Sequence, residues 1–369
     1  MIAQNDFARQ WDAVGPAVMR VVQRVGASGR YILGREVDQF EKTLAEFWGV
    51  SHAVGVGNGM DALEIALRCL RLQAGDKVLT TSFSAFATTL AILRAGGIPV
   101  FVDVDDNGNI DLSQCREVLA GDRSIRFFLP VHLYGNPLDL EKLLELKTDF
   151  DLVVVEDCAQ AISAKDNGRA VGTVGQAAGT SFYPTKNLGA FGDGGALLTN
   201  DGRLAERAKM LRNYGQSSLY AHDERGLNSR LDELHAAILS EALLPNLEAW
   251  TGRRRQIAAR YQSEITNPAL RMLRVNNNIE PAWHLFPLFT HSRDRLHDYL
   301  QDLQIGTGVH YPLVLPDQKA LQQRTVVEVA VEPRTARNLA AAELSIPIHP
   351  FLKEAERTAI IDALNRFVP

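Results

Sequence analysis

The fold class is indicated most directly by one stretch, Val153-Val154-Val155-Glu156-Asp157-Cys158-Ala159-Gln160. It begins with a continuous apolar run, which is typical of a strand buried on both faces of a parallel sheet. The run ends in two acids. In open α/β sheets ligands bind beyond the carboxyl ends of the strands, so Asp157 is well placed to face a ligand. From this stretch alone, a helix cap or a surface acid would explain Asp157 equally well.

The same kind of strand recurs through the N-terminal two thirds of the chain, in alternation with helical patterns. Residues 53–57 and 127–131 are predicted strands, and apolar residues at helical spacing occupy 62–70. This alternation favours an α/β/α sandwich in which crossover helices cover a mostly parallel sheet.

The pattern changes beyond residue 215. A polar loop is followed by a long helical stretch, in which Pro245 is expected to cause a kink or a break. We therefore predict a large α/β domain over residues 1–245 and a smaller C-terminal α+β domain over residues 246–369.

Composition and charge narrow the class of protein. The 369 residues are 46% hydrophobic and 22% charged, as in ordinary globular domains. A net charge of −5 gives no general attraction to nucleic acid or to anionic membranes. We find no signal-like or membrane-spanning segment, and the three cysteines show no paired spacing. We expect a reduced, cytoplasmic protein with neither a nucleic-acid partner nor a membrane partner.

Two further features have plain interpretations. The run Arg253-Arg254-Arg255 lies near Glu248 in a predicted helix and is interpreted as a solvated basic face. His291 and His297 lack the spacing of metal ligands, and we predict no metal site.

A single lysine stands in a stretch suited to chemistry, Thr180-Ser181-Phe182-Tyr183-Pro184-Thr185-Lys186-Asn187-Leu188-Gly189. A lysine that forms a Schiff base needs a partly desolvated site, which favours its neutral amine. An isolated lysine would be read as a solvated loop residue. Pyridoxal phosphate, however, needs a lysine for its aldehyde and an acid at its pyridine nitrogen. Lys186 and Asp157 provide that pair at the ends of successive predicted strands.

Gly57-Asn58-Gly59-Met60-Asp61 lies between a predicted strand and a predicted helix. Glycines let the backbone approach a phosphate, and a helix N-terminus stabilises its charge. The stretch is neither a Walker motif nor a full dinucleotide fingerprint, and alone it is a weak signal.

Residues 28–235 closely resemble the DegT/StrS family of nucleotide-sugar aminotransferases, and the resemblance continues more loosely to the C-terminus. It is carried by seven collinear segments: Ser28 to Gly34, Gly57 to Leu63, Pro99 to Val104, Val131 to Gly135, Glu156 to Ala161, Ser181 to Gly195, and Asn228 to Glu233.

The resemblance implies the fold type I architecture of aspartate aminotransferase and a homodimer with active sites at the subunit interface. It implies that Lys186 forms the Schiff base and shuttles protons, and that Asp157 pairs with the pyridine nitrogen. It also implies further cofactor contacts, which are Gly59, Met60, Gln160, Ser181 and, from the other subunit, Asn228. Relatives with dehydratase activity carry histidine in place of this lysine, so Lys186 favours transamination.

The sequence departs from the family pattern at the residue that would stack on the cofactor ring. The family usually places a stacking aromatic residue two positions before an Ala-Thr pair, which here is Ala87-Thr88. That position is Ala85, with Phe83 and Phe86 as neighbours. Either a neighbouring phenylalanine stacks on the ring, or the ring is held less tightly on that face.

Substrate contacts are suggested by segments that resemble those lining the sugar-nucleotide site. The candidates are Tyr31, Tyr183, Tyr220, His222, Arg230, His310 and Tyr311. For any single one a structural role is at least as good an explanation, because tyrosine and histidine often complete cores with one polar end satisfied.

The resemblance is greatest to 3-aminotransferases, and it implies conversion of a dTDP-3-keto-6-deoxyhexose to the dTDP-3-amino-3,6-dideoxyhexose with L-glutamate as donor. An alternative is a nucleotide-sugar 4-aminotransferase or a cyclitol aminotransferase of the same family. A more remote alternative is a regulator that binds pyridoxal phosphate without turnover.

Overall fold

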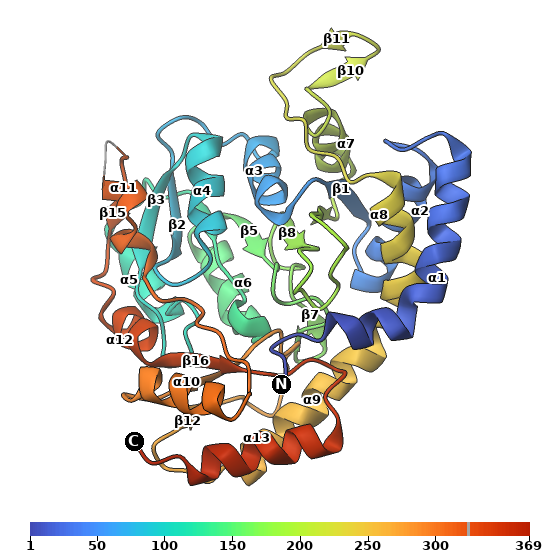
Figure 1. The fold of residues 1–369 in the computed structure, drawn as a ribbon. Coiled ribbons are helices and arrows are strands. Elements are labelled where there is room, and N and C mark those ends of the chain that lie inside the picture. Colours follow the sequence, from blue (N-terminus) through green and yellow to red (C-terminus); the bar gives the residue numbers. More distant parts are fainter. Residues whose placement is uncertain (323–324) are drawn as a thin grey trace.

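The centre of the molecule is an eight-stranded sheet (Figure 1). A computed structural model describes residues 1–322 and 325–369. In sheet order the strands are β1 (His52–Val56), β9 (Gly195–Thr199), β8 (Ala177–Ser181), β5 (Val153–Asp157), β4 (Phe127–Leu129), β2 (Lys77–Thr81), β3 (Ile98–Val102) and β15 (Glu328–Val329). Only β9 runs antiparallel to its neighbours in this sheet. The predicted α/β fold with a mostly parallel sheet is therefore confirmed.

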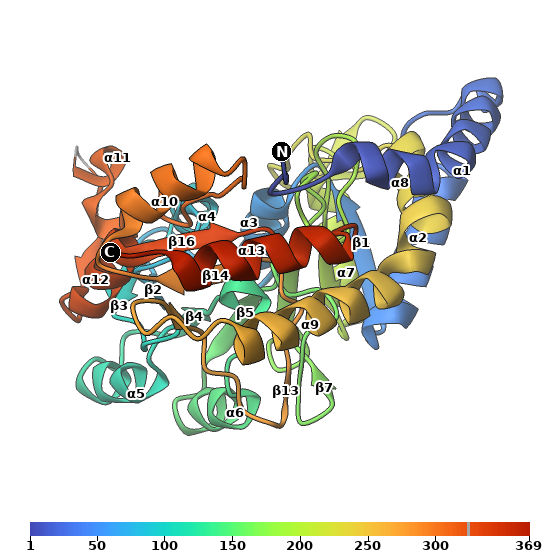
Figure 2. The ribbon, with the colours of Figure 1, turned by 60° about the horizontal axis from the view of Figure 1, so that its bottom comes forward.

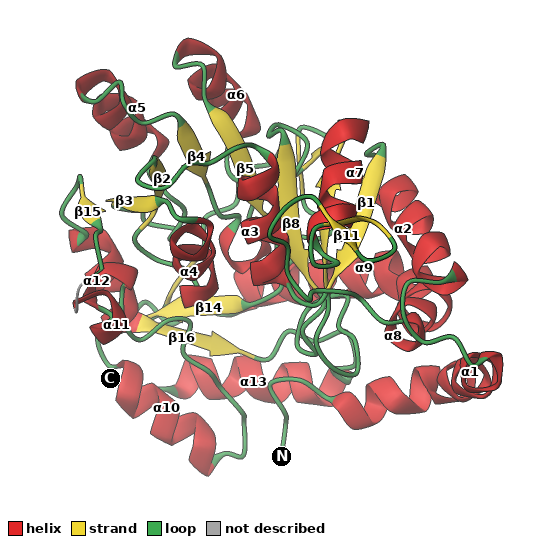
Figure 3. Ribbon diagram, turned by 90° about the horizontal axis from the view of Figure 1, so that it is seen from above, coloured by secondary structure: helices red, strands yellow, loops and turns green. Residues whose placement is uncertain are grey.

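Helices cover both faces of this sheet, which explains the continuous apolar strands. On β5, Val154 faces one buried cluster and Val155 faces another, so consecutive residues are both removed from water. Figures 2 and 3 show α5 and α6 on one face and α3 and α4 on the other. The helices of this lobe are α1 (Phe7–Ser28), α2 (Arg35–Trp48), α3 (Gly59–Cys69), α4 (Phe86–Ala95), α5 (Leu112–Gly121), α6 (Leu140–Asp149), α7 (Gly202–Leu211) and α8 (Glu233–Ile238).

The predicted long helix after residue 230 is interrupted. After α8 the chain makes a π turn at η2 (Leu239–Leu243) and a 3-10 turn at η3 (Leu244–Asn246), and then begins α9 (Leu247–Glu264). The predicted break at Pro245 is confirmed, because proline cannot donate the next helical hydrogen bond.

The C-terminal lobe has a sheet and a core of its own. Its sheet has the order β12 (Arg271–Met272), β14 (Phe286–Phe289) and β16 (Glu343–Ile346). Buried aromatic side chains such as Tyr261 and Phe286 fill the space between this sheet and the helices. Besides α9, those helices are α10 (Arg293–Asp302), α11 (Lys319–Gln322), α12 (Arg334–Ala342) and α13 (Glu354–Arg366).

Two segments cross the predicted domain boundary. Ile2, at the start of the chain, forms a bridge with Ile305 of the C-terminal lobe. In return, β15 extends the large sheet by pairing with β3. The division at residues 245 and 246 stays a prediction, since each lobe contains a piece from the other side of it.

Several short elements complete the fold. They are β6 (Lys165–Asp166), β7 (Arg169–Ala170), β10 (Gln216–Ser218), β11 (Ala221–His222), β13 (Ile279–Glu280), η1 (Leu133–Gly135) and η4 (Leu315–Asp317). The β10–β11 hairpin projects away from the rest of the chain (Figure 1), and Leu219 and Tyr220 at its tip are exposed. Among the described residues, no helix combines the length and the apolar character needed to cross a membrane.

Candidate active site

Asp157 lies buried at the carboxyl end of β5, as the sequence predicted. The Thr88 hydroxyl donates to its Oδ2 at 2.8 Å, and the Ala159 N–H donates to its Oδ1 at 3.0 Å. Burial raises the pKa of Asp157, and these two hydrogen bonds act against that rise. The carboxylate is thus held in one orientation, and a positively charged partner would favour its ionised form.

Lys186 lies in the turn region after β8, where its N–H donates to the carbonyl of Tyr183 at 2.8 Å. Burial lowers the pKa of its amine to about 8, although the charge of Asp157 acts in the opposite direction. At pH 7 about a tenth of such amines are neutral, against roughly three in ten thousand for an ordinary lysine. Lys186 can therefore act as a nucleophile and as a carrier of protons.

Both groups line one cavity of about 280 Å³ at the carboxyl ends of the strands. Four further predicted contacts, Gly59, Met60, Gln160 and Ser181, line the same cavity, as does Tyr183. Its remaining wall comes from residues that the sequence did not single out as contacts, namely Asn58, Leu63, Ser84, Ala85, Ala87, Val131, Ala159 and Asp193.

One end of this cavity suits an anion. Asn58 caps α3, its Oδ1 accepting from the Asp61 N–H at 2.8 Å, and Gly59 opens the helix. A Cβ added to Gly59 would lie 2.7 Å from the Cβ of Ser181, so glycine allows the helix end and β8 to approach. The Ser181 hydroxyl accepts from the Tyr183 N–H at 3.2 Å, which leaves its own proton free to donate. A helix N-terminus with a nearby hydroxyl can bind a phosphate.

A second cavity, of about 230 Å³, also has Lys186 in its lining. Lys186 and Tyr183 line both cavities, and the predicted residues His310 and Tyr311 line this one. The Nε2 of Gln160 donates to the Tyr311 hydroxyl at 3.0 Å and so links the two walls. The other lining residues are Gln4, Asn5, Thr185, His284, Leu285 and Ile348.

Five predicted residues line neither cavity of their own chain: Tyr31, Tyr220, His222, Asn228 and Arg230. Tyr220 is at the tip of the projecting hairpin, and the backbone of Asn228 pairs with Asn213. Arg230 donates to the Asn213 Oδ1 at 3.0 Å.

The structure also answers the question about the missing aromatic residue. Ala85 lines the first cavity, whereas Phe83 and Phe86 do not. Phe83 is buried against Tyr311, with ring centroids 6.5 Å apart, and Phe86 packs against a small cluster that contains Leu315. Neither phenylalanine borders this cavity, where the methyl group of Ala85 is exposed to the interior instead.

One interpretation of the sequence was wrong. Arg254 belongs to no solvated face, because it is buried and donates to the carbonyl oxygens of Trp283 and His284 at 3.2 and 3.4 Å. Arg255 is half-buried and donates to the carbonyl of Ser163 at 2.8 Å. Arg254 and Arg255 thus join α9 to neighbouring loops, which local sequence could not reveal, whereas Arg253 is exposed as predicted.

Behind Asp157 lies a buried group of three side chains that metals commonly use, His132, Glu156 and Cys158. The Glu156 carboxylate already accepts N–H bonds from Gly172, Val174 and Gly175 at 2.7 to 2.8 Å. His132 donates to it through Nε2 at 3.0 Å, because His132 Nδ1 accepts from a backbone N–H. These contacts make Glu156 a support for the loop after β7.

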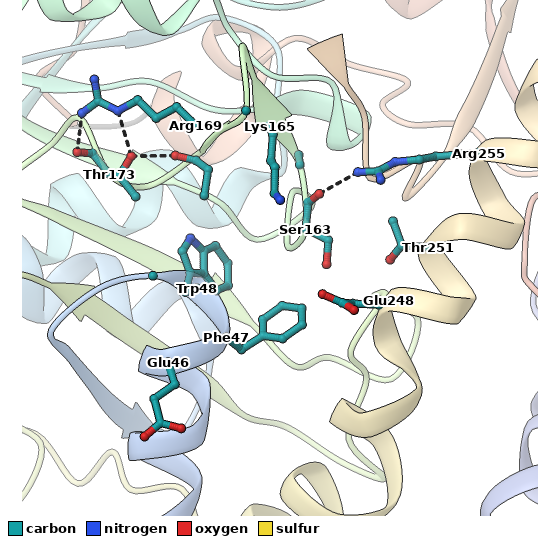
Figure 4. A pocket seen from close by; sticks show the side chains of 14 residues that line it. Glu46, Phe47, Trp48, Ser163, Lys165, Arg169, Thr173, Glu248, Thr251 and Arg255 are labelled. Atoms are coloured by element: carbon teal, nitrogen blue, oxygen red, sulfur yellow. Dashed lines mark hydrogen bonds between the residues drawn. The ribbon is translucent and has the colours of Figure 1, made fainter. Parts of the chain in front are cut away.

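Figure 4 shows a larger cleft of about 690 Å³ between α2, the β6–β7 hairpin and α9. Its arginines are held by the protein itself: Arg169 donates to the carbonyl of Thr173 at 2.7 Å, and Arg255 is bound to Ser163. Lys165 in this cleft is exposed. Size therefore does not select this cleft, whereas the buried amine and carboxylate mark the smaller cavity as the candidate active site.

Fold and site together define an α/β enzyme that carries a buried, reactive lysine opposite an acid. The family model that matches the chain, over residues 14–365, is that of the DegT/DnrJ/EryC1/StrS aminotransferase family. The chain belongs to this family, and the predicted family is confirmed.

Individual relatives match over nearly the whole chain. A "dTDP-3-amino-3,6-dideoxy-alpha-D-galactopyranose transaminase" of Aneurinibacillus thermoaerophilus is 40% identical and covers 95% of each chain. A "pleiotropic regulatory protein" of Geobacillus stearothermophilus is 39% identical, over 98% of this chain and 97% of its own. The crystal structure of S. venezuelae DesV with a ketimine intermediate has a TM-score of 0.92 at 38% identity, covering 99% of this chain and 98% of that one.

Proposed function

We propose that the protein converts a dTDP-3-keto-6-deoxyhexose to the corresponding 3-amino-3,6-dideoxyhexose, with L-glutamate as amino donor and pyridoxal phosphate as cofactor. One observation carries the proposal: the Lys186 amine and the Asp157 carboxylate line the same cavity at the ends of β8 and β5. The dTDP-3-amino sugar named for the Aneurinibacillus relative supports the choice of substrate and of position 3.

The residues fit pyridoxal phosphate on three counts. The amine of Lys186 is partly neutral and can bind an aldehyde. The buried Asp157 lacks a cationic partner among its hydrogen bonds, and a protonated pyridine nitrogen would supply one. The N-terminus of α3, with the Ser181 hydroxyl beside Gly59, suits the phosphate.

When bound, pyridoxal phosphate supplies an electron sink for the bond that is broken at the α carbon of the donor. Lys186 removes the proton from that carbon and returns a proton to the sugar carbon in the second half of the reaction. Asp157 keeps the pyridine nitrogen protonated. Gln160 is fixed by the Tyr134 N–H, which donates to its Oε1 at 2.6 Å, and so forms a rigid wall beside the ring.

We further propose a homodimer in which Asn228 of a second copy completes the phosphate site. Its support is that Asn228 lines neither of the two cavities that Lys186 lines and follows the projecting β10–β11 hairpin (Figure 1). Co-expression of Lys186→Ala and Asn228→Asp chains tests this. Mixed dimers regain one intact site, so about a quarter of wild-type activity is expected, and no recovery would exclude a shared site.

The reaction is tested by supplying the protein with pyridoxal phosphate, L-glutamate and a 3-keto or a 4-keto dTDP-sugar. The amino sugar is expected with the 3-keto substrate. Lys186→Ala should abolish it, and the matched control Lys165→Ala, in the remote cleft, should not. Turnover of only the 4-keto substrate would overturn position 3, and turnover by Lys186→Ala would overturn the mechanism.

A second candidate is a regulator that binds pyridoxal phosphate without turnover. It is favoured by one observation, the name of the Geobacillus relative. Absence of product with every keto sugar, together with intact cofactor binding, would support this candidate over the first.

A further inference from the structure

Three residues of the C-terminal lobe form a buried hydrogen-bonded chain that ends at the second cavity. Glu343 and Ser345 are two positions apart on β16, so their side chains lie on the same face of the strand. Both are fully buried. The backbone of Ser345 pairs with Gly308, which brings His310 over the two side chains.

The hydrogen bonds that join these three residues are short and specific. The Ser345 hydroxyl lies 2.5 Å from the Glu343 Oε1, and the His310 Nδ1 lies 3.0 Å from the Ser345 Oγ. The His310 N–H donates to the other carboxyl oxygen of Glu343 at 2.5 Å. Glu343 therefore holds both the backbone and, through Ser345, the ring of His310.

The other ring nitrogen is the one available to a substrate. His310 lines the cavity that contains Lys186, and within residues 1–322 and 325–369 its Nε2 has no hydrogen-bond partner. Burial and the nearby charge of Lys186 lower the pKa of His310 to about 4. The ring is neutral at physiological pH, so only one of its two nitrogens carries a proton.

The protonation state of Glu343 decides which ring nitrogen carries the proton. If Glu343 is ionised, it can only accept; Ser345 must donate to it, and His310 must donate to Ser345 through Nδ1–H, which leaves Nε2 bare. If Glu343 is protonated at Oε1, it donates to Ser345, Ser345 donates to Nδ1, and the proton of the ring lies on Nε2. The chain of hydrogen bonds thus has two directions.

We propose that Glu343 and Ser345 are positioning residues that place the ring proton of His310 on Nε2, where it donates to an acceptor oxygen of the bound keto sugar. The inference rests on the proposed function, because it requires that the sugar occupy the second cavity. A ketone or phosphate oxygen can only accept, so a bare Nε2 could not bind it.

The surroundings of Glu343 allow both states near neutral pH. Burial raises the pKa of Glu343 to about 8, while Ser345, the His310 N–H and the charge of Arg293 act against the rise. Tyr134 and Tyr311 also interact with Glu343, and burial raises the pKa of both phenols. Ionisation of Glu343 above pH 8 would reverse the hydrogen-bonded chain.

The test is the pH dependence of kcat/KM for the keto sugar in the wild type and in Glu343→Gln. Glutamine is isosteric: its oxygen can accept from the His310 N–H, and its amide can only donate to Ser345. It therefore mimics protonated glutamate at every pH. Lys186, with a pKa of about 8, titrates in both proteins over this range. Between pH 7 and pH 9 the wild type should therefore lose about fivefold more kcat/KM than Glu343→Gln does, through a rise in KM. An unchanged pH step in Glu343→Gln would overturn the proposal.

A second variant keeps the proposal testable if Glu343→Gln does not fold. Ser345→Ala interrupts the hydrogen bonds between Glu343 and His310, so KM for the sugar should rise about fivefold at pH 7 while the glutamate half-reaction keeps its rate. The matched control is Ser82→Ala, since Ser82 is equally buried and its hydroxyl has no hydrogen-bond partner in the described part of the chain. Equal behaviour of Ser345→Ala and Ser82→Ala would refute the role of the hydroxyl.

A readout without turnover separates this inference from the proposed function. In protein labelled with 15N-histidine, the chemical shifts of the two ring nitrogens show which one is protonated, and His310→Gln assigns the signals. The wild type should change from Nε2–H to Nδ1–H between pH 7 and pH 9, and Glu343→Gln should stay Nε2–H. A tautomer that does not change in the wild type would refute the inference even if the sugar is turned over.

Discussion

The pKa of Lys186 can be tested through the substitution of its neighbour, Asp157→Asn. Burial lowers this pKa to about 8, and the negative charge of Asp157 keeps it from falling further. Removing that charge should lower the pKa further, because the ammonium form loses a stabilising negative charge. The neutral amine, which reacts with an aldehyde, should then dominate at a lower pH.

The size of the effect is bounded by the neutral fraction. With a pKa of about 8, about 10% of the amine is neutral at pH 7 and nearly all of it at pH 9.5. The rate of covalent capture of pyridoxal phosphate at pH 7 should therefore be about a tenth of its plateau in the wild type. In Asp157→Asn this ratio should rise, by at most about tenfold, because the neutral fraction cannot exceed one.

The assay is stopped-flow absorbance of cofactor-free protein mixed with pyridoxal phosphate between pH 6 and pH 10, each rate being divided by the plateau of its own variant. The matched control is Asp139→Asn, which removes a half-exposed charge from the N-cap of α6 and keeps a good capping residue. A wild-type inflection near 10.5, or a lower ratio in Asp157→Asn than in the wild type, would refute the reasoning.

Three further substitutions have defined outcomes. Ala85→Phe should restore ring stacking, worth about 0.5–1.5 kcal/mol, and lower the dissociation constant of the cofactor about 2- to 10-fold in equilibrium dialysis. Gly59→Ala should raise the dissociation constant of the cofactor at least about tenfold in the same assay, since the new methyl group would lie 2.7 Å from the Cβ of Ser181. Glu156→Gln should cost about 3–6 kcal/mol in guanidinium unfolding, because one amide nitrogen would replace an oxygen that accepts two N–H bonds. Burial opposes ionisation of Glu156, but His132 and the backbone N–H groups lower its pKa below 4.5. Its contribution to the free energy of unfolding is therefore fully present above pH 4.5 and should shrink as the pH falls.

Much of the first cavity could be predicted because its residues follow strands. A continuous apolar run buried on both faces must be central in a sheet, and its C-terminal end then points to the ligand side. This logic located Asp157. Lys186 was expected at the end of a strand-like segment, and only its pairing with an acid distinguished it from a surface lysine.

The second cavity was harder to predict because its walls come from distant parts of the chain. Gln4 and Asn5 reach it only because Ile2 pairs with Ile305, a contact across some three hundred residues that no local pattern encodes. Thr88 could have been found, since it belongs to the Ala-Thr pair that marked the missing aromatic residue. Its bond to Asp157, however, depends on the angle at which α4 meets β5.

The position of Lys186 in the wall between two cavities also bears on the handedness of the product. A group tethered to one wall reaches a planar reaction centre from one side only. If Lys186 carries the proton in both halves of the reaction, the donor is deprotonated and the sugar is protonated on the same face. The configuration of the new stereocentre would then be fixed by the position of Lys186, for every sugar that the cavity holds in the same orientation.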